Sequence, residues 1–481
     1  MALAPPPQIS MNPLKRLRMD LERERRRTEP LPPGELQFSI ARTRRMRTDP
    51  LRLVLECYER YGPVFSMRLL HEPVVFVIGP EANHYVTVSH AQNFRWRDGS
   101  FGDLIPLLGD GLLTIDGDYH RRSRKLMLPV FHRDRIAATA GTMVEEAERA
   151  LEGWQPGRQV DMYHWTRALA MRIAMRALFG FNPDDKSHGF DEAAEFEEAL
   201  SYYATDYAIQ ILRGPRTPWA RMIKARERLD RLIFGQISRR RTSGDAGDDI
   251  LSLLLEASDE DGNTLSDRAV RDQVMTLLFA GHDTTTSTVT FLFYELARHP
   301  QALARLIEEQ DRVLGGRMAT AAELMGGEAL PELEMAVDET LRLYPPAWVG
   351  PRMSVEPFEL CGVRVPAETY VNYSSWVTHH LPEVYPDPEA FVPERFAPEA
   401  KAELPKGAYV PFGGGSRTCI GMRFGQLEIK TIATLILQRC RLELQPGYRM
   451  RIRQMPTLSP IDGLPMRVLE RTQPAALARA A

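Results

Sequence analysis

The sequence has few cysteines and no paired cysteine spacing. Only four occur among the 481 residues, and they are widely scattered: Cys57, Cys361, Cys419 and Cys440. A disulfide framework and a structural zinc site are therefore excluded, and a reducing compartment fits best. The length allows either several domains or one large globule.

The chain also lacks long apolar runs and an excess of either charge. No run reaches the roughly 18 residues that span a bilayer, and the N-terminus has no secretory h-region, so we expect no transmembrane segment. The 61 basic and 64 acidic residues give a net charge of −3, which provides no overall attraction to nucleic acid or anionic membrane. We therefore expect a cytoplasmic protein without a nucleic-acid partner.

Residues 1–35 are rich in proline, arginine and glutamate, and predict an N-terminal arm before a single domain over residues 36–481. Three leucines between residues 14 and 21 follow helical spacing among basic residues, so a helix that docks on a membrane surface or a partner is one interpretation. The other is a solvated helix that packs on its own domain. Three acidic residues between 20 and 24 favour the second interpretation, because they dilute the positive charge.

Most of the chain carries helical periodicity, and a small part carries strand patterns. A hairpin is expected over residues 64–78 and a strand-rich segment over 358–375. Short strands from both ends are expected to pair, so the chain is not divided at the loop 242–249. The fold class is mainly α with a small β part (α+β). Helices are expected at about 139–154, 162–180, 190–212, 218–241, 267–298, 301–314, 333–343 and 422–440.

The most informative segment is the glycine-rich decapeptide that runs from Phe412 to Gly421 and contains Cys419. Three consecutive glycines allow backbone conformations closed to other residues and close approach to a large flat object. A glycine loop before a helix can also cradle phosphate, but the lysine and Ser/Thr of a P-loop are absent. The N–H groups of the following helix would favour a Cys419 thiolate. A buried structural cysteine is the alternative.

This decapeptide resembles the haem-binding signature of the cytochrome P450 superfamily, matching its Phe, Gly, Arg, Cys and Gly positions, and the resemblance covers roughly residues 35–470. It implies the cytochrome P450 fold with a long central helix over the haem, and haem b as cofactor. Cys419 would be the axial thiolate ligand of the iron, which favours O–O cleavage. Phe412 would screen the sulfur, Arg417 would neutralise a propionate, and Gly421 would complete the haem-binding loop.

The helix expected over 267–298 follows Ser266, a good N-cap, and would be about 48 Å long at 1.5 Å per residue. Its middle contains Asp283 and Thr284 within the sequence AGHDTT. On residue types alone, a threonine here can bond back to the preceding turn. The family pattern of small, Gly, any residue, acid, Thr, Thr implies instead a proton relay by Asp283 and Thr284 from a locally opened turn.

Two further motifs resemble structural and propionate-binding parts of the family. Glu339 and Arg342 stand at i, i+3 and can pair. Such pairs are usually surface features, but with the later segment PERF at 393–396 they resemble the family's buried network, in which Arg395 would join them. The propionate contacts would come from one histidine, which stands where the family has Trp, and two arginines that could otherwise be solvated: His120, Arg124 and Arg352.

The family's pocket-forming segments, carried over to this sequence, point to ten residues that could also be ordinary core: Phe94, Trp96, Phe101, Tyr203, Tyr207, Phe279, Ala280, Trp348, Val349 and Leu458. Their aromatic and aliphatic character favours a lipophilic substrate, such as a fatty acid, terpenoid, steroid or polyketide.

The resemblance implies a haem-thiolate monooxygenase that receives electrons from an external donor, because no flavin or ferredoxin module is appended. A ferredoxin or flavodoxin with its reductase is expected, steered by a basic patch of Arg121, Arg122, Lys125 and Arg423. We expect a monomer. The alternatives are a peroxide-driven hydroxylase on the same fold, against which Asp283 and Thr284 argue, and a non-catalytic haem sensor or electron carrier.

Overall fold

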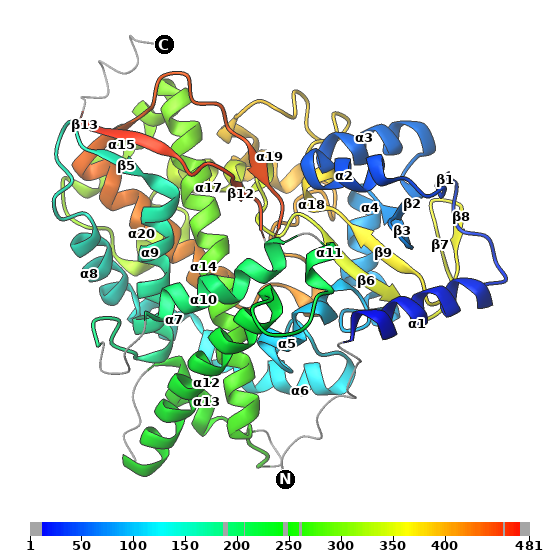
Figure 1. Ribbon diagram of the computed structural model, residues 1–481. Coiled ribbons are helices and arrows are strands. Elements are labelled where there is room, and N and C mark those ends of the chain that lie inside the picture. Colours follow the sequence, from blue (N-terminus) through cyan, green and yellow to red (C-terminus); the bar gives the residue numbers. More distant parts are fainter. Residues whose placement is uncertain are drawn as a thin grey trace.

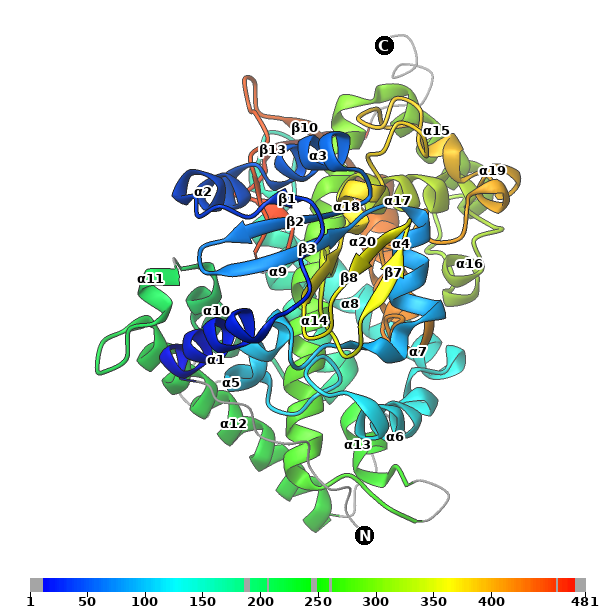
Figure 2. The same ribbon diagram turned by 90° about the vertical axis from the view of Figure 1, so that its right-hand side faces the viewer.

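The computed structural model describes residues 12–185, 191–205, 207–243, 249–258, 262–455 and 457–471. Residues 1–11 of the predicted arm and 244–248 of the predicted loop lie outside the described residues. Helices make up the larger part of the molecule, and a sheet lies to one side of it (Figures 1 and 2). The α+β class predicted from the sequence is confirmed.

Helix α14 (Asp267–Arg298) crosses the centre of the molecule (Figure 1). The Ser266 side chain caps its first turn by accepting a hydrogen bond from the Ala269 N–H at 3.2 Å. The helix ends before Pro300, where α15 (Pro300–Leu314) begins. Most of its length is buried. The long central helix is therefore confirmed at the predicted bounds.

Long helices that pack against α14 include α9 (Met162–Ile173), α12 (Pro218–Ser243), α17 (Pro331–Leu343) and α20 (Met422–Arg439). The remaining helices are α1 (Pro13–Arg26), α2 (Ile40–Thr48), α3 (Pro50–Tyr61), α4 (Pro80–His84), α5 (Ile105–Leu108), α6 (Gly117–Met127), α7 (Arg133–Ala138), α8 (Ala140–Ala150), α10 (Glu192–Ser201), α11 (Tyr207–Gln210), α13 (Ile250–Glu256), α16 (Ala321–Gly326), α18 (Ser375–Thr378) and α19 (Pro398–Glu403). No helix in the described ranges is long and apolar enough to cross a membrane.

Two predicted helices break before their expected ends, and the helix predicted at 139–154 ends at Ala150. The helix predicted at 162–180 leaves α-geometry after Ile173 and continues as one π-turn. The helix predicted at 190–212 breaks after Ser201, where the Tyr202 hydroxyl donates to the Gln210 carbonyl at 3.0 Å and closes a loop. Both breaks depend on contacts that cannot be inferred from the helical spacing of apolar residues in the sequence.

The main sheet has the strand order β1-β2-β3-β9-β6-β4. The predicted hairpin is β2 (Val64–Leu69) with β3 (Glu72–Val77), and β3 pairs in parallel with β9 (Tyr370–Tyr373). Strands from both ends of the chain therefore pair, as predicted. The other strands are β1 (Gly34–Glu35), β4 (Phe94–Arg95), β5 (Gln159–Asp161), β6 (Gly350–Ser354), β7 (Phe358–Leu360), β8 (Val363–Val365), β10 (Cys440–Leu444), β11 (Ile452–Arg453), β12 (Ser459–Pro460) and β13 (Pro465–Glu470).

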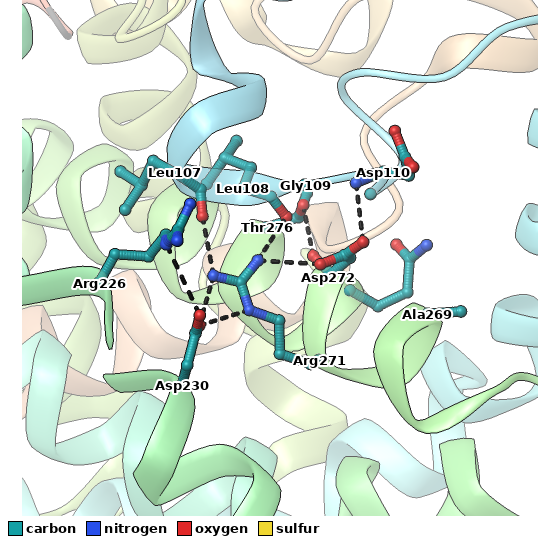
Figure 3. Close-up of polar contacts among 12 residues, drawn as sticks. Leu107, Leu108, Gly109, Asp110, Arg226, Asp230, Ala269, Arg271, Asp272 and Thr276 are labelled. Atoms are coloured by element: carbon teal, nitrogen blue, oxygen red, sulfur yellow. Dashed lines mark hydrogen bonds and ion pairs between the residues drawn. The ribbon is translucent and has the colours of Figure 1, made fainter. Parts of the chain in front are cut away.

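A buried arginine of α14 fixes the segment that precedes α6 (Figure 3). The Arg271 guanidinium donates to the carbonyls of Leu107 at 3.1 Å and Leu108 at 3.2 Å, and to Asp230 of α12 at 2.5 Å. Asp272 accepts a hydrogen bond from the Asp110 N–H at 2.9 Å. These contacts hold the loop against two long helices, so the residues that follow it reach the functional site from a fixed starting point.

Candidate functional site

The glycine-rich loop folds back on itself immediately before α20. The Cys419 N–H donates to the Phe412 carbonyl at 2.9 Å. Gly415 has φ +59°, and a Cβ at this position would overlap the backbone of Thr87, so glycine is required there. Cys57 and Cys440 are buried, whereas the Cys419 side chain is exposed. Cys419 therefore differs in accessibility from these two buried thiols.

Two opposing effects of its surroundings act on the pKa of Cys419. Desolvation by the surrounding protein raises the pKa of the thiol, and the Gly421 N–H and the Arg124 guanidinium oppose this rise. Arg124 donates to the carbonyl of Thr418 at 2.6 Å, which holds its positive charge beside the cysteine. A cation bound to the sulfur would favour the thiolate further.

A cluster of cations lies close to the cysteine loop. Arg417 pairs with Asp116 at 2.6 Å. The Trp96 ring lies 3.7 Å from the Arg352 guanidinium and 5.0 Å from that of Arg417. Arg352 is only 2% exposed. Trp96, predicted as a pocket residue, thus stacks on the arginines.

This cluster carries more positive charge than its carboxylate neutralises. Burial, followed by the charges of Arg417 and Arg124, lowers the pKa of His120 to about 3. Burial lowers the pKa of Arg417 to about 10, Asp116 opposes this shift, and the neighbouring arginines add to it. Buried charges are costly unless they are paired. Arg124, Arg352 and Arg417 beside one carboxylate, Asp116, therefore fit a ligand with two carboxylates, as haem has.

The middle of α14 presents a half-buried face that contains Ala280, Gly281 and Thr284. The Thr284 hydroxyl donates to the Ala280 carbonyl at 2.6 Å, and α14 is continuous here. The locally opened turn predicted from the sequence is therefore wrong, because the threonine bonds back within a regular helix. Asp283 is buried and lies 3.4 Å from the Arg167 guanidinium of α9.

A second buried carboxyl group connects α14 to α20. The Thr285 hydroxyl donates to Glu428 Oε2 at 2.9 Å, and Glu428 Oε1 has no hydrogen-bond partner. Burial raises the pKa of Glu428 to about 8, although the Thr285 hydrogen bond opposes this rise. Because Glu428 lies on α20, which directly follows the cysteine loop, this bond ties that helix to the AGHDTT segment of α14.

Glu339, Arg342 and Arg395 come together in the interior. Arg342 donates to both Glu339 carboxylate oxygens, at 2.7 and 2.8 Å, and both side chains are fully buried. The Arg395 Nε lies 3.5 Å from Glu339 Oε1. Arg342 also donates to the carbonyls of His379, Pro388 and Ala390. The pair is thus the centre of a network that joins α17 to the segment before the cysteine loop.

The predicted pocket residues that the structure describes have different surroundings. Phe101 stacks on Trp96 at 4.8 Å between ring centroids. Phe279 and Ala280 are half-buried on α14, and Tyr203 is buried after α10. The side chain of Tyr207 lies outside the described part of the chain. The other four pack in core clusters, which are formed by Phe94 with Tyr85 and Phe358, and by Trp348, Val349 and Leu458 with Phe291 and Trp376.

Sequence reasoning missed several site residues. Asp116 pairs with Arg417 and also accepts the backbone N–H groups of Trp96 and Arg97. Residues 116 and 417 are far apart in the sequence, so no motif or spacing predicts that they pair. The position of Glu428 among apolar residues of the helix that follows the cysteine loop was the one signal that could have drawn attention to a buried acid.

Comparisons with known proteins agree with this arrangement. The family model described as "Cytochrome P450" matches residues 30–464. Cyclooctatin synthase of Streptomyces melanosporofaciens is 36% identical over 86% of this chain and 90% of its own length. Cyclooctat-9-en-7-ol 5-monooxygenase of the same organism is 38% identical over 73% of this chain and 76% of its own length.

Solved structures show the same fold. A cyanobacterial CYP120A1 bound to retinoic acid superposes with a TM-score of 0.81 at 29% identity, covering 92% of this chain and 99% of that one. The haem domain of cytochrome P450DA superposes with a TM-score of 0.82 at 26% identity, covering 92% and 98%. The cysteine loop, the cation cluster, the central helix and these matches together place the chain in the cytochrome P450 family.

Proposed function

We propose that this haem-thiolate monooxygenase, which acts on a lipophilic substrate, uses Cys419 as the iron ligand and Asp283 with Thr284 to deliver protons. The observation that carries the proposal is that Cys419 lies beside Arg124, in a cluster of arginines whose positive charge Asp116 only partly neutralises. When bound, haem b would activate O₂ with two electrons, so that one oxygen atom enters a C–H or C=C bond and the other leaves as water.

The residues around the cysteine loop have separate tasks. Arg124, Arg352 and Arg417 would bind the propionates through charge-assisted hydrogen bonds, and the His120 imidazole would donate one more. Phe412 would screen the sulfur from water, and the Gly421 N–H would hold it in place. We propose that His120, which stands where the family has Trp, still donates a hydrogen bond to a propionate but offers a smaller ring for packing.

The proton path would start at Asp283. Its carboxylate is held by Arg167, so it must exchange that ion pair for water before it can carry a proton inward. The Thr284 hydroxyl, which now donates to the Ala280 carbonyl, would turn to orient a water beside the reacting oxygen. General acid–base groups of this kind contribute about 10²–10⁴-fold to rate.

Electrons would come from an external carrier, and we propose a ferredoxin or flavodoxin with its reductase. Arg121, Arg122 and Lys125 on α6 and Arg423 at the start of α20 are exposed. An acidic carrier would be steered to this patch, and the rate would fall with ionic strength. We also propose a cytoplasmic monomer with one catalytic domain over residues 36–481.

Among the four candidate substrate classes we propose a terpenoid. One solved relative is bound to retinoic acid, an isoprenoid, and one curated relative is named for 5-monooxygenation of cyclooctat-9-en-7-ol. Binding spectra against fatty acids, terpenoids, steroids and polyketides test this choice. A shift toward the high-spin form with terpenoids, followed by an oxygenated product, is expected.

The reduced carbon-monoxide spectrum tests the ligand. The intact protein should show the red-shifted Soret band of thiolate ligation, and Cys419→Ala should lose it. A histidine-type band in the intact protein, unchanged in Cys419→Ala, would contradict the proposal. Turnover with NAD(P)H, ferredoxin and reductase separates a monooxygenase from a sensor, which yields no oxygenated product, and from a hydroxylase that works only with peroxide.

A further inference from the structure

The Trp96 ring contacts two arginines of the cation cluster. The centre of the ring lies 3.7 Å from the guanidinium carbon of Arg352 and 5.0 Å from that of Arg417. A guanidinium within about 6 Å of a ring centre is attracted to the negative face of the ring, and tryptophan is the best ring for this contact. Trp96 therefore acts on two of the three arginines beside the cysteine loop.

Asp116 fixes the backbone of Trp96. Its carboxylate accepts the Trp96 N–H at 3.0 and 3.1 Å, and the Arg97 N–H at 2.8 Å. The same carboxylate pairs with Arg417 at 2.6 Å. One carboxylate thus sets the position of the residue that carries the ring and of an arginine beside that ring.

The segment that carries Trp96 is tied to the central helix α14. The Arg97 side chain donates to Asp110 and to the Thr114 carbonyl, both at 2.8 Å. The Asp110 N–H donates in turn to Asp272 of α14 at 2.9 Å (Figure 3). Because these bonds lead from residue 97 to a buried helix, the Trp96 ring has a firm support.

Other aromatic rings complete the surroundings of Trp96 and Arg352. The Phe101 ring lies nearly parallel to that of Trp96, with 4.8 Å between centroids and 16° between planes. The Tyr373 ring of β9 lies 5.2 Å from the Arg352 guanidinium. Arg352 is buried, and no carboxylate in the described part of the chain pairs with it. Aromatic rings therefore take the place of an acidic partner for this arginine.

Contact with a ring holds a guanidinium in place without neutralising its charge. A long arginine side chain that is free in solution must be ordered when it binds a carboxylate, and this ordering weakens binding. Arg352 and Arg417 both contact the Trp96 ring, so they are placed beforehand and keep their charges for an anion. A pre-organised site for two carboxylates requires this arrangement.

We propose that Trp96 is a positioning residue for haem, which holds Arg352 and Arg417 ready for the two propionates. The inference rests on the proposed function, because it needs haem beside the cysteine loop. It gives Trp96 a role on the propionate side of the haem in place of the substrate pocket. His120 would donate a hydrogen bond there, whereas Trp96 acts through the two arginines.

The rate of haem transfer to apomyoglobin and the midpoint potential of the haem-loaded full chain test the proposal. Trp96→Leu should lose haem about tenfold faster, because two arginine side chains must then be ordered on binding. Its midpoint potential should fall, because propionates that are less well neutralised stabilise the more positive, ferric iron. Trp96→Met, which also lacks a ring, should show the same two changes. Trp96→Phe keeps a ring that attracts cations less strongly, and should lie between Trp96→Leu and the unaltered protein.

Trp219→Leu is the matched control, because the Trp219 ring on α12 is also half-buried and lies 3.9 Å from a guanidinium, that of Arg213. It should change neither the rate of haem loss nor the potential. Equal changes in Trp219→Leu, or a haem-loss rate and potential that stay unaltered in Trp96→Leu and Trp96→Met, would overturn the proposal. Weaker substrate binding with unaltered haem loss and potential would also overturn it, and would leave Trp96 in the substrate pocket.

The reduced carbon-monoxide spectrum separates this proposal from the proposed function. Every variant should keep the band of thiolate ligation, because none of them changes Cys419. Absence of that band from the intact protein would refute the proposed function and the positioning role with it. An intact band together with unaltered haem loss in the Trp96 variants would refute the positioning role alone.

Discussion

Replacing Glu339 by Gln should destabilise the protein strongly, because it removes the charge that compensates a fully buried arginine. The Arg342 guanidinium makes five hydrogen bonds between 2.7 and 3.0 Å, two of them to Glu339 and three to backbone carbonyls. Glutamine keeps the shape but leaves Arg342 uncompensated, and breaking such a buried pair costs about 3–5 kcal/mol. The substitution also removes the carboxylate beside Arg395, so a second positive charge is left unneutralised nearby.

Urea unfolding of the haem-loaded protein, followed by circular dichroism, measures this loss. The exposed pair of Arg317 and Glu323, which is also bidentate at 2.9 and 2.6 Å, provides the control. Glu323→Gln should cost less than about 1 kcal/mol, since solvent screens an exposed pair. The double change Glu339→Gln/Arg342→Met should cost less than the sum of its single changes. Equal effects of Glu339→Gln and Glu323→Gln would refute the reasoning.

Further predictions concern proton transfer, pH and electron supply. Thr284→Ala should divert electrons to peroxide and lower product formed per NAD(P)H, and Asp283→Asn should slow turnover by about 10²-fold or more, measured with the reconstituted electron chain. Glu428 has a folded-state pKa near 8, above its unfolded value. At acid pH the carboxyl group is protonated in both the folded and the unfolded state, so burial costs no ionisation energy. As pH rises toward 8, the free energy of unfolding therefore falls by about 1.4 kcal/mol per pH unit. Glu428→Gln should remove this fall between about pH 5 and 8. Arg121→Glu/Arg122→Glu should raise the KM for ferredoxin and weaken its salt dependence, and an unchanged KM would exclude the basic patch.

Much of the predicted fold and site follows from the spacing of residues that are close together in the sequence. The triple glycine before Cys419, the AGHDTT segment and the i, i+3 spacing of Glu339 and Arg342 are all features of neighbouring residues. The bounds of α14 followed from Ser266 and Pro300, because capping and proline act within one helical turn. Thr284 shows the limit of this reasoning, since its hydroxyl bonds within a regular helix and not in the opened turn that was predicted.

By itself, the sequence determined the family, the cofactor and the α+β class, and it predicts the cysteine that would bind iron, because each depends on residues that are close along the chain. Only the tertiary structure decided that Asp116 meets Arg417, that Arg167 meets Asp283 and that Glu428 meets Thr285. It also decided that Leu14 and Leu21 of α1 are exposed while Leu17 is half-buried. Helical periodicity identifies an apolar stripe but not its partner, because the partner comes from distant segments that only the packing of the whole chain brings together.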